Sequence, residues 1–465
     1  MRRVPAYTPA QVHARGRAPQ RRVPGEQRMQ KTTKFWVGVG AFLVASTAGE
    51  TLVTDPMAVL SNPIPAALAA GGEGGETGGE GGGRPASYKL NSTDANAFAF
   101  DASAQVTGYV AHVFESYTAA HRGAKRLQAA IDRFLKSPNA TTLADARNAW
   151  TSARVFYLKT EAFRFYDGPI DLKTPTGSEE GPEGHINAWP LNEAFIDGVK
   201  GNPKSGLIND RKVPVTRAAI LERDQVSDEA DVTTGWHAIE FLLWGQDFSA
   251  TGPGNRPASD YTPGQGNNDR RRAYLKIVTD MLVDDLGALA KAWDPAGKDN
   301  YAAYFKALDQ REALGRIFAG VASLSGYELM SERLAVALDS GDQEDEHSCF
   351  SDTTWQDFLF DIRGIREVYS GGAATPAGAS LQALVAQRAP EVNNAVLAAL
   401  AAVEADAEAL PRPFDQEVLR ASKDSEGRKT AEKLVKDLTT LASALADAGA
   451  AVGVLVVVPT AHKAE

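Results

Sequence analysis

Cysteine is almost absent from this chain of 465 residues, since Cys349 is the only one. A single thiol excludes an intramolecular disulfide framework, and it excludes the zinc sites that are built from several cysteines. A metal site in this chain must therefore use carboxylates, imidazoles or both. That ligand set suits iron, manganese or zinc. Histidine is also scarce, with seven residues in the whole chain.

Several catalytic signatures are missing as well. The chain contains no H-E-x-x-H sequence, no G-x-S-x-G nucleophile elbow and no P-loop, which argues against the common zinc proteases, α/β-hydrolases and nucleoside triphosphatases. Cys349 lies close to His347, but adjacency in sequence does not make a catalytic dyad, and we interpret the cysteine as a buried or loop thiol. A hydrolytic zinc site would have to be assembled from residues far apart in the sequence.

The charge of the chain is unevenly distributed. Residues 1–34 contain nine Lys or Arg and one acid, a local charge of +8, so the total of −10 leaves −18 on the remaining residues. An acidic body argues against a nucleic-acid partner and suits a protein that attracts cations.

The N-terminal region has the pattern of an export signal. A basic segment ending at Lys34 precedes an apolar run over 35–48, which is too short to span a bilayer comfortably. The alanine-rich stretch 66–70 offers a cleavage site of the A-x-A type, so we interpret residues 1–70 as a leader and predict export. An uncleaved N-terminal membrane anchor is the alternative, because the cleavage site lies far from the apolar run.

The pattern of the body predicts an all-α protein. Residues 71–95 form a flexible linker rich in Gly and Glu, and apolar residues then recur with the helical period of 3.6. Strand signals are poor apart from an ambiguous tail at 454–458. We predict two fused up-and-down helical bundles, over residues 96–262 and 263–465.

The stretch 235–247, GWHAIEFLLWGQD, is the clearest candidate for chemistry. It predicts a helix that is apolar around nearly its whole circumference, and such a helix is buried. His237 and Glu240 stand at i and i+3 and share one face. A buried glutamate is unfavourable unless something pairs with it, and that partner is either another residue or a metal ion. Trp236 and Asp247 of the same stretch are candidates for the ligand pocket.

Two other segments contribute candidate site residues. The acidic segment 343–354, QEDEHSCFSDTT, contains Glu346, His347, Ser348 and Asp352. This segment is either an acidic loop followed by a helix cap or part of the site. The helix expected over 142–166 carries Arg154 and Glu161. These residues either belong to ordinary ion pairs on one helix face or, for Glu161, provide a buried carboxylate directed at the site of Glu240.

Four motifs resemble a known family. Residues 235–240, Gly-Trp-His-Ala-Ile-Glu, fit the G-x-H-x-x-E signature of imelysin-like proteins. Three stretches resemble the branch called iron-regulated protein A: 187–193 (NAWPLNE), 254–257 (GNRP) and 346–352 (EHSCFSD). The resemblance covers roughly residues 100–458, and the motifs occur in the expected order.

The resemblance implies a pair of fused helical bundles, located in the periplasm or associated with the outer membrane, and a role in iron acquisition. It also implies that His237 and Glu240 are the metal-binding pair. The family takes its name from an insulin-cleaving metallopeptidase activity.

We therefore expect an extracytoplasmic protein that binds a metal ion or an iron-bearing small ligand through His237 and Glu240. Glu161, Glu346 and His347 would complete or neutralise the site. The expected metal is iron, divalent or ferric, with zinc as the alternative, and the expected protein partner is a membrane iron-transport protein. Two other functions stay open: a metallopeptidase whose bound metal activates water, and a helical protein with a metal-free His/Glu pair.

Overall fold

The computed structural model describes residues 41–43, 87–90, 100–175 and 177–459. All of these belong to one compact unit, Val39–Glu465. Nearly all of the predicted leader and linker lies outside the described residues.

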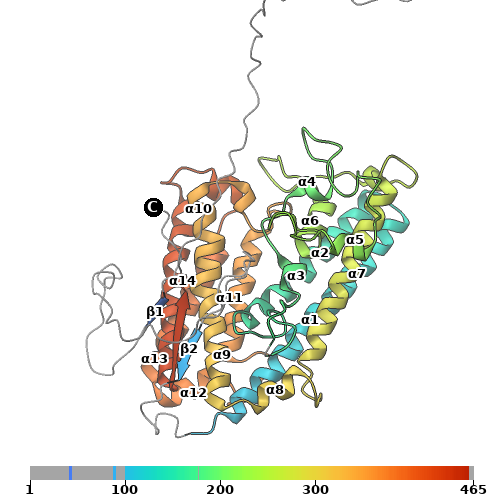
Figure 1. Ribbon diagram of the computed structural model, residues 1–465. Helices are drawn as coiled ribbons and strands as arrows, with labels where there is room; N and C mark the ends of the chain where they lie inside the picture. The colour runs from blue at the N-terminus through green and yellow to red at the C-terminus, as the bar shows by residue number, and fades with distance from the viewer. Residues whose placement is uncertain (1–40, 44–86, 91–99, 176, 460–465) are drawn as a thin grey trace, which may run out of the picture. The chain divides into compact units, whose positions relative to one another are not determined.

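Four helices form the core of the first half (Figure 1). They are α1 (Ser103–Lys136), α2 (Ala140–Leu158), α6 (Gly235–Trp244) and α7 (Asn268–Ala292). Helix α1 lies against α2 and α7, and α6 lies between the same two helices. The connections carry short helices: η3 (Lys159–Phe163), α3 (Glu183–Asn187), α4 (Glu193–Ile196), α5 (Arg217–Leu221), η4 (Ala258–Tyr261) and α8 (Tyr301–Ala307).

The second half is a group of helices around α14. Its elements are α9 (Gln310–Ser323), the π-helix η5 (Leu324–Ala335), α10 (Val336–Ser340), η6 (Gln343–Asp345), α11 (Thr354–Ser370), α12 (Leu381–Arg388), α13 (Pro390–Ala409), the π-helix η7 (Asp415–Leu419) and α14 (Glu426–Ala451). Helix α14 packs against α13, α9 and η5, and α11 packs against α13. The predicted all-α class with two helical bundles is confirmed.

A small antiparallel sheet is added to the helices. Its strand order is β1 (Ala41–Leu43), β3 (Val454–Pro459), β2 (Ser87–Leu90). Ala41 pairs with Pro459, and Ser87 pairs with Val457. The ambiguous tail of the sequence is thus a strand, and it packs against α9 and α14.

The two halves are in contact through α11, which lies against α2 and η3 of the first half. Helix α7 belongs to the predicted second bundle, 263–465, yet it packs against α1 and α6, which belong to the predicted first bundle. The boundary between the bundles therefore stays a prediction.

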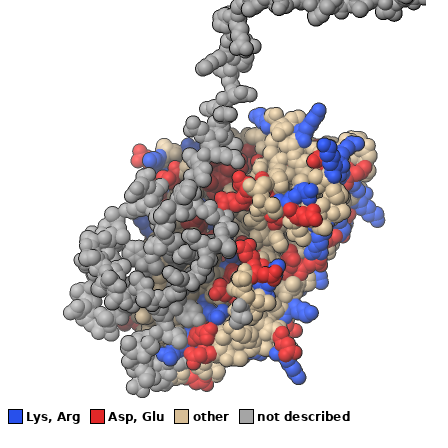
Figure 2. All heavy atoms as spheres, in the orientation of Figure 1, with Lys and Arg blue, Asp and Glu red and all other residues tan. Residues whose placement is uncertain are grey.

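The surface carries charges of both signs. On the face seen in Figure 2, described Lys and Arg side chains are interspersed with Asp and Glu side chains. None of the helices among the described residues has the length and the apolar composition needed to cross a bilayer.

Candidate metal centre

The centre is built on α6, whose ten residues are all buried, as its apolar pattern predicted. Gly235 starts this helix with φ of +81°, a conformation that other L-residues rarely adopt. A Cβ at this position would lie 2.4 Å from the carbonyl oxygen of Ile186. The glycine of the G-x-H-x-x-E motif thus lets the chain of α3 pass directly over the first turn of α6.

His237 and Glu240 form a hydrogen-bonded pair inside the protein. Nδ1 of His237 lies 2.8 Å from Oε2 of Glu240, and the two residues are 1% and 0% exposed. The other carboxylate oxygen, Oε1, accepts hydrogen bonds from the backbone N–H and the hydroxyl of Ser351, at 2.9 and 2.7 Å. Burial raises the pKa of Glu240 to about 8. Without a metal the carboxyl group of Glu240 is therefore mainly protonated at neutral pH and can donate its proton to Nδ1 of His237.

His347 meets His237 from the second half of the chain. Their Nε2 atoms are 3.2 Å apart, and Nδ1 of His347 contacts Oδ2 of Asp357. Ser348 donates its hydroxyl to the same oxygen at 2.6 Å. Burial lowers the pKa of His347 to about 4. Burial, followed by the charge of Arg154, lowers the pKa of His237 well below its usual value. Both imidazoles are therefore neutral at pH 7.

Arg154 of α2 supplies the positive charge of the centre. Its Nε and Nη2 donate to the two oxygens of Asp357, each at 3.2 Å, and its Nη1 donates to Oδ1 of Asn187 at 2.7 Å. Its Nη2 also lies 3.3 Å from Nε2 of His237. Although burial alone would raise it, Arg154 and His347 hold the pKa of Asp357 well below its ordinary value. The centre thus contains one permanent ion pair.

This arrangement fits the requirements of a metal ligand pair. In metal sites a ligating histidine usually turns its second nitrogen to a carboxylate, which fixes the tautomer and the ring. His237 and His347 each do this through Nδ1, and their Nε2 atoms face each other. Two nitrogens 3.2 Å apart can bind one ion at typical lengths of about 2.0–2.1 Å. The indole of Trp189 covers the pair, with its ring 4.7 Å from that of His237 and 6.0 Å from that of His347.

The structure brings together five of the residues proposed from the sequence: Arg154, His237, Glu240, His347 and Ser348. Trp236 supports them indirectly, because its ring lies 5.8 Å from the guanidinium carbon of Arg154.

Glu161 lies with arginines instead of with the imidazoles. Its Oε2 accepts hydrogen bonds from Nη2 of Arg333 at 2.6 Å and from Nη1 of Arg164 at 2.9 Å. Burial would raise the pKa of Glu161, but these two guanidinium groups lower it to about 2. The carboxylate is therefore already neutralised by the chain. The pair of Glu161 with Arg164 matches the alternative interpretation of this segment, ordinary ion pairs on one helix face. The pair with Arg333 comes from η5.

Three other proposed residues lie together in a separate acidic group. Asp247 and Asp352 lie close to Asp415, and the charges of all three act on Glu346. One oxygen of Glu346 accepts a hydrogen bond from Thr354 at 2.7 Å, and no contact in the described structure links this glutamate to His237.

Sequence reasoning did not propose Asp357, Asn187, Trp189 or Ser351 as site residues, although the last three lie within the motifs 187–193 and 346–352. Asp357 carries a signal that could have revealed it. It precedes Asp361 by four residues on a helix that also holds Phe358, Leu359 and Ile362, so two acids share an apolar face. The same reasoning that marked Glu240, a carboxylate within a buried helix, applies there.

Comparisons with known proteins show which family and fold the chain resembles. The model of the imelysin family matches residues 113–445. Iron-regulated protein A of Synechococcus elongatus is 26% identical over 322 residues, which are 67% of this chain and 76% of that protein.

Two solved structures share the fold. One is an iron-regulated protein A precursor from Parabacteroides distasonis, with a TM-score of 0.59 and 18% identity, which covers 75% of this chain and 94% of its own. The other is an imelysin-like protein from Psychrobacter arcticum, with a TM-score of 0.51, 16% identity and the same coverage. Because the family model matches well over half of the residues, this chain belongs to the imelysin family.

Proposed function

We propose that this chain is an exported metal-binding protein of iron acquisition, with the ion bound between Nε2 of His237 and Nε2 of His347. The observation that carries the proposal is the facing pair of nitrogens, 3.2 Å apart, on two rings that are each oriented by a carboxylate. On binding of the ion Glu240 would lose its proton, and the carboxylates of Glu240 and Asp357 would each accept the Nδ1–H of one ring, which leaves both Nε2 lone pairs free. The relative from Synechococcus elongatus is named an iron-regulated protein, and imidazole is a suitable ligand for iron.

The charge near the nitrogens favours an ion that arrives with an anionic ligand. Although Asp357 pairs with it, the guanidinium of Arg154 lies 3.3 Å from the same Nε2 of His237, and its charge opposes a bare cation at that nitrogen. An iron ion that carries a carboxylate or a similar oxyanion would pair that anion with Arg154, whose planar fork of donors suits such groups. An iron-bearing small ligand is thus supported better than the free ion.

The depth of the centre favours binding over peptide hydrolysis. His237, Glu240, His347 and Asp357 are at most 4% exposed. A peptidase needs the scissile bond within hydrogen-bond reach of its catalytic groups. A small ion complex needs a much narrower opening than a peptide. A metallopeptidase therefore stays the second candidate, on the strength of the family's reported activity alone.

The direct test measures bound metal. The purified protein would be titrated with Fe²⁺, with Zn²⁺ and with ferric citrate. The metal retained after dialysis would then be measured by elemental analysis. We expect about one equivalent in the wild type, and at least a tenfold weaker affinity in His237→Ala and in His347→Ala. His121→Ala, which changes a partly exposed histidine outside the centre, is the matched control.

Each result has a definite meaning. Equal retention in the wild type and both variants would refute the site. Cleavage of a peptide that a chelator stops and a metal restores would favour the peptidase. If Arg154 binds the anion, the wild type retains more iron from ferric citrate than from Fe²⁺. Arg154→Met should abolish this preference. Export and a membrane transport partner are tested separately, by fractionation of cells and by co-purification with membrane proteins under iron starvation.

A further inference from the structure

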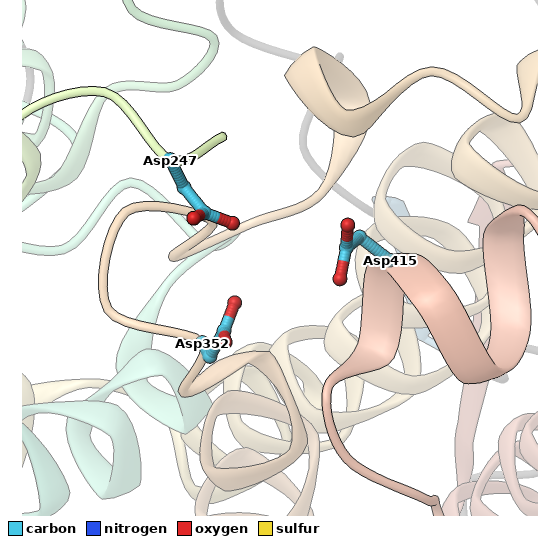
Figure 3. A group of neighbouring side chains, drawn as sticks. All are labelled: Asp247, Asp352 and Asp415. Atoms are coloured by element: carbon cyan, nitrogen blue, oxygen red, sulfur yellow. The ribbon is translucent and has the colours of Figure 1, made fainter. Parts of the chain in front are cut away.

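A second group of carboxylates lies outside the histidine centre. Asp247 follows α6, Asp352 precedes α11, and Asp415 is the first residue of η7. Each offers an oxygen within 4.8 Å of an oxygen of the other two, and Figure 3 shows the three carboxylate groups turned toward one another. Like charges at such distances repel one another, so an acidic group of this kind requires compensation.

One oxygen of Asp415 in this group has no hydrogen-bond partner among the described residues. The residue is fully buried, and its Oδ2 contacts Nη1 of Arg420 at 3.2 Å and Nε2 of Gln416 at 2.5 Å. Its Oδ1 is buried and accepts no hydrogen bond from the described residues. Both oxygens of Asp352 are also buried and accept no hydrogen bond from the described residues. Buried polar atoms are nearly always paired, so these unpaired oxygens point to a ligand.

Glu346 is a fourth buried acid with an unpaired oxygen. It is 1% exposed, and within the described structure its Oε2 has no hydrogen-bond donor.

The chain compensates only part of this charge. Asp247 accepts hydrogen bonds from the neutral side chain of Gln343 at 2.8 Å and from the backbone of Ser249 at 2.9 Å. Arg420 is the one cation that an ion pair links to the group in the described structure, and half of its side chain is exposed. With all three carboxyl groups ionised, they and one guanidinium carry a charge of −2, which a divalent cation would balance.

We propose that Asp247, Asp352 and Asp415 bind a hard divalent cation, Ca²⁺, at a site distinct from the histidine centre. All the donors are oxygens, the ligands that Ca²⁺ prefers. Calcium binds oxygens at about 2.3–2.6 Å, so oxygens on opposite sides of the ion lie roughly 4.6–5.2 Å apart. The separations found here, within 4.8 Å, fall in this reach.

The cation would connect segments from both halves of the chain. Asp247 comes from the first predicted bundle, and the other two ligands come from the second. The segment 346–352 also carries His347, so binding of Ca²⁺ would hold the loop that delivers one imidazole. The inference does not depend on iron binding, and either proposal can fail alone.

The test measures calcium binding and thermal unfolding of the purified protein. We expect Ca²⁺ to bind the wild type in equilibrium dialysis and to raise its Tm by several degrees, because a ligand that binds only the folded state stabilises it. Asp352→Asn and Asp415→Asn should lower the affinity for Ca²⁺ at least tenfold. In the presence of EDTA the same variants should unfold at or above the Tm of the wild type, since each removes a repulsive charge.

Controls separate this site from its surroundings. Asp339→Asn changes an exposed aspartate of α10 and should leave calcium binding unchanged. His237→Ala should also retain it, since no imidazole takes part. Circular dichroism confirms that each variant is folded. The proposal is overturned if the wild type does not bind Ca²⁺, or if Asp352→Asn and Asp415→Asn bind it as tightly as the wild type.

Discussion

Arg333 of η5 donates from Nη2 to Oε2 of Glu161 in η3, at 2.6 Å, across the contact between the two halves of the chain. Its Nη1 donates to Asp361 of α11 at 3.0 Å, and its Nε donates to Glu328 at 2.9 Å. Glu161 and Asp361 are both fully buried. One guanidinium group thus donates to carboxyl groups of η3, η5 and α11, and this network connects the two halves of the chain.

Removal of that guanidinium should be strongly destabilising. Arg333→Met leaves Glu161 and Asp361 buried with less compensation, and loss of one partner of a buried pair costs about 3–5 kcal/mol. We expect a lower free energy of unfolding of that size in urea denaturation. Arg363→Met removes a partly exposed arginine that pairs with Glu404 and should cost below about 1 kcal/mol. Equal losses in the two variants would contradict the structural role of the network.

Gly235 should not tolerate a side chain. Gly235→Ala places a Cβ 2.4 Å from the carbonyl oxygen of Ile186, at a φ of +81°. The strain of a left-handed non-glycine residue is of order 1–3 kcal/mol, and the clash adds to it. We expect a loss of about 3 kcal/mol or more in thermal or chemical unfolding. Gly252→Ala is the control, since its Cβ would meet no atom within 4 Å. A loss in Gly235→Ala no larger than in this control would show that α3 can move away.

Asp357 should act on metal affinity through His347. Asp357→Asn keeps the shape of the side chain but removes the charge that orients the imidazole and pairs with Arg154. Loss of such an orienting group lowers metal affinity by about 10- to 100-fold. We expect that loss in a titration with the metal retained by the wild type, and we expect at least partial recovery in Asp357→Glu. Asp284→Asn, at a surface ion pair, should have no effect.

His112 should make the fold sensitive to acid. Burial lowers its pKa from 6.5 to about 4, and its Nε2 has no partner among the described residues. Between these pH values the unfolded chain binds a proton that the folded chain does not, so the stability falls as the pH falls. The loss for this group amounts to roughly 3 kcal/mol at pH 4.

The check is the pH dependence of unfolding in His112→Leu. The free energy of unfolding of this variant, relative to that of the wild type, should increase from pH 7 to pH 4 by about the amount given above. A constant difference over that range would show that the imidazole of His112 titrates normally in the folded protein.

Much of the fold and one half of the centre follow from local patterns. The 3.6 period of apolar residues predicted the helices, because amphipathic repeats are written in neighbouring residues. The same logic predicted a buried helix in the stretch 235–247 with His237 and Glu240 on one face, and the structure has this helix over Gly235–Trp244. The division between the bundles was less accessible, since α7 packs on α1 through contacts that span more than a hundred residues.

The sequence by itself thus determined the helical class, the family motifs and the buried pair of α6, because each depends on residues a few positions apart. Only the tertiary structure decided which distant groups meet that pair. His347 approaches from 110 positions further along the chain, and Asp357, rather than Glu161, supplies the second orienting carboxylate. Both acids are buried beside arginines, so composition could not distinguish them. Helix α11 packs against α2 and η3. In that packing Asp357 pairs with Arg154, and Glu161 pairs with Arg333.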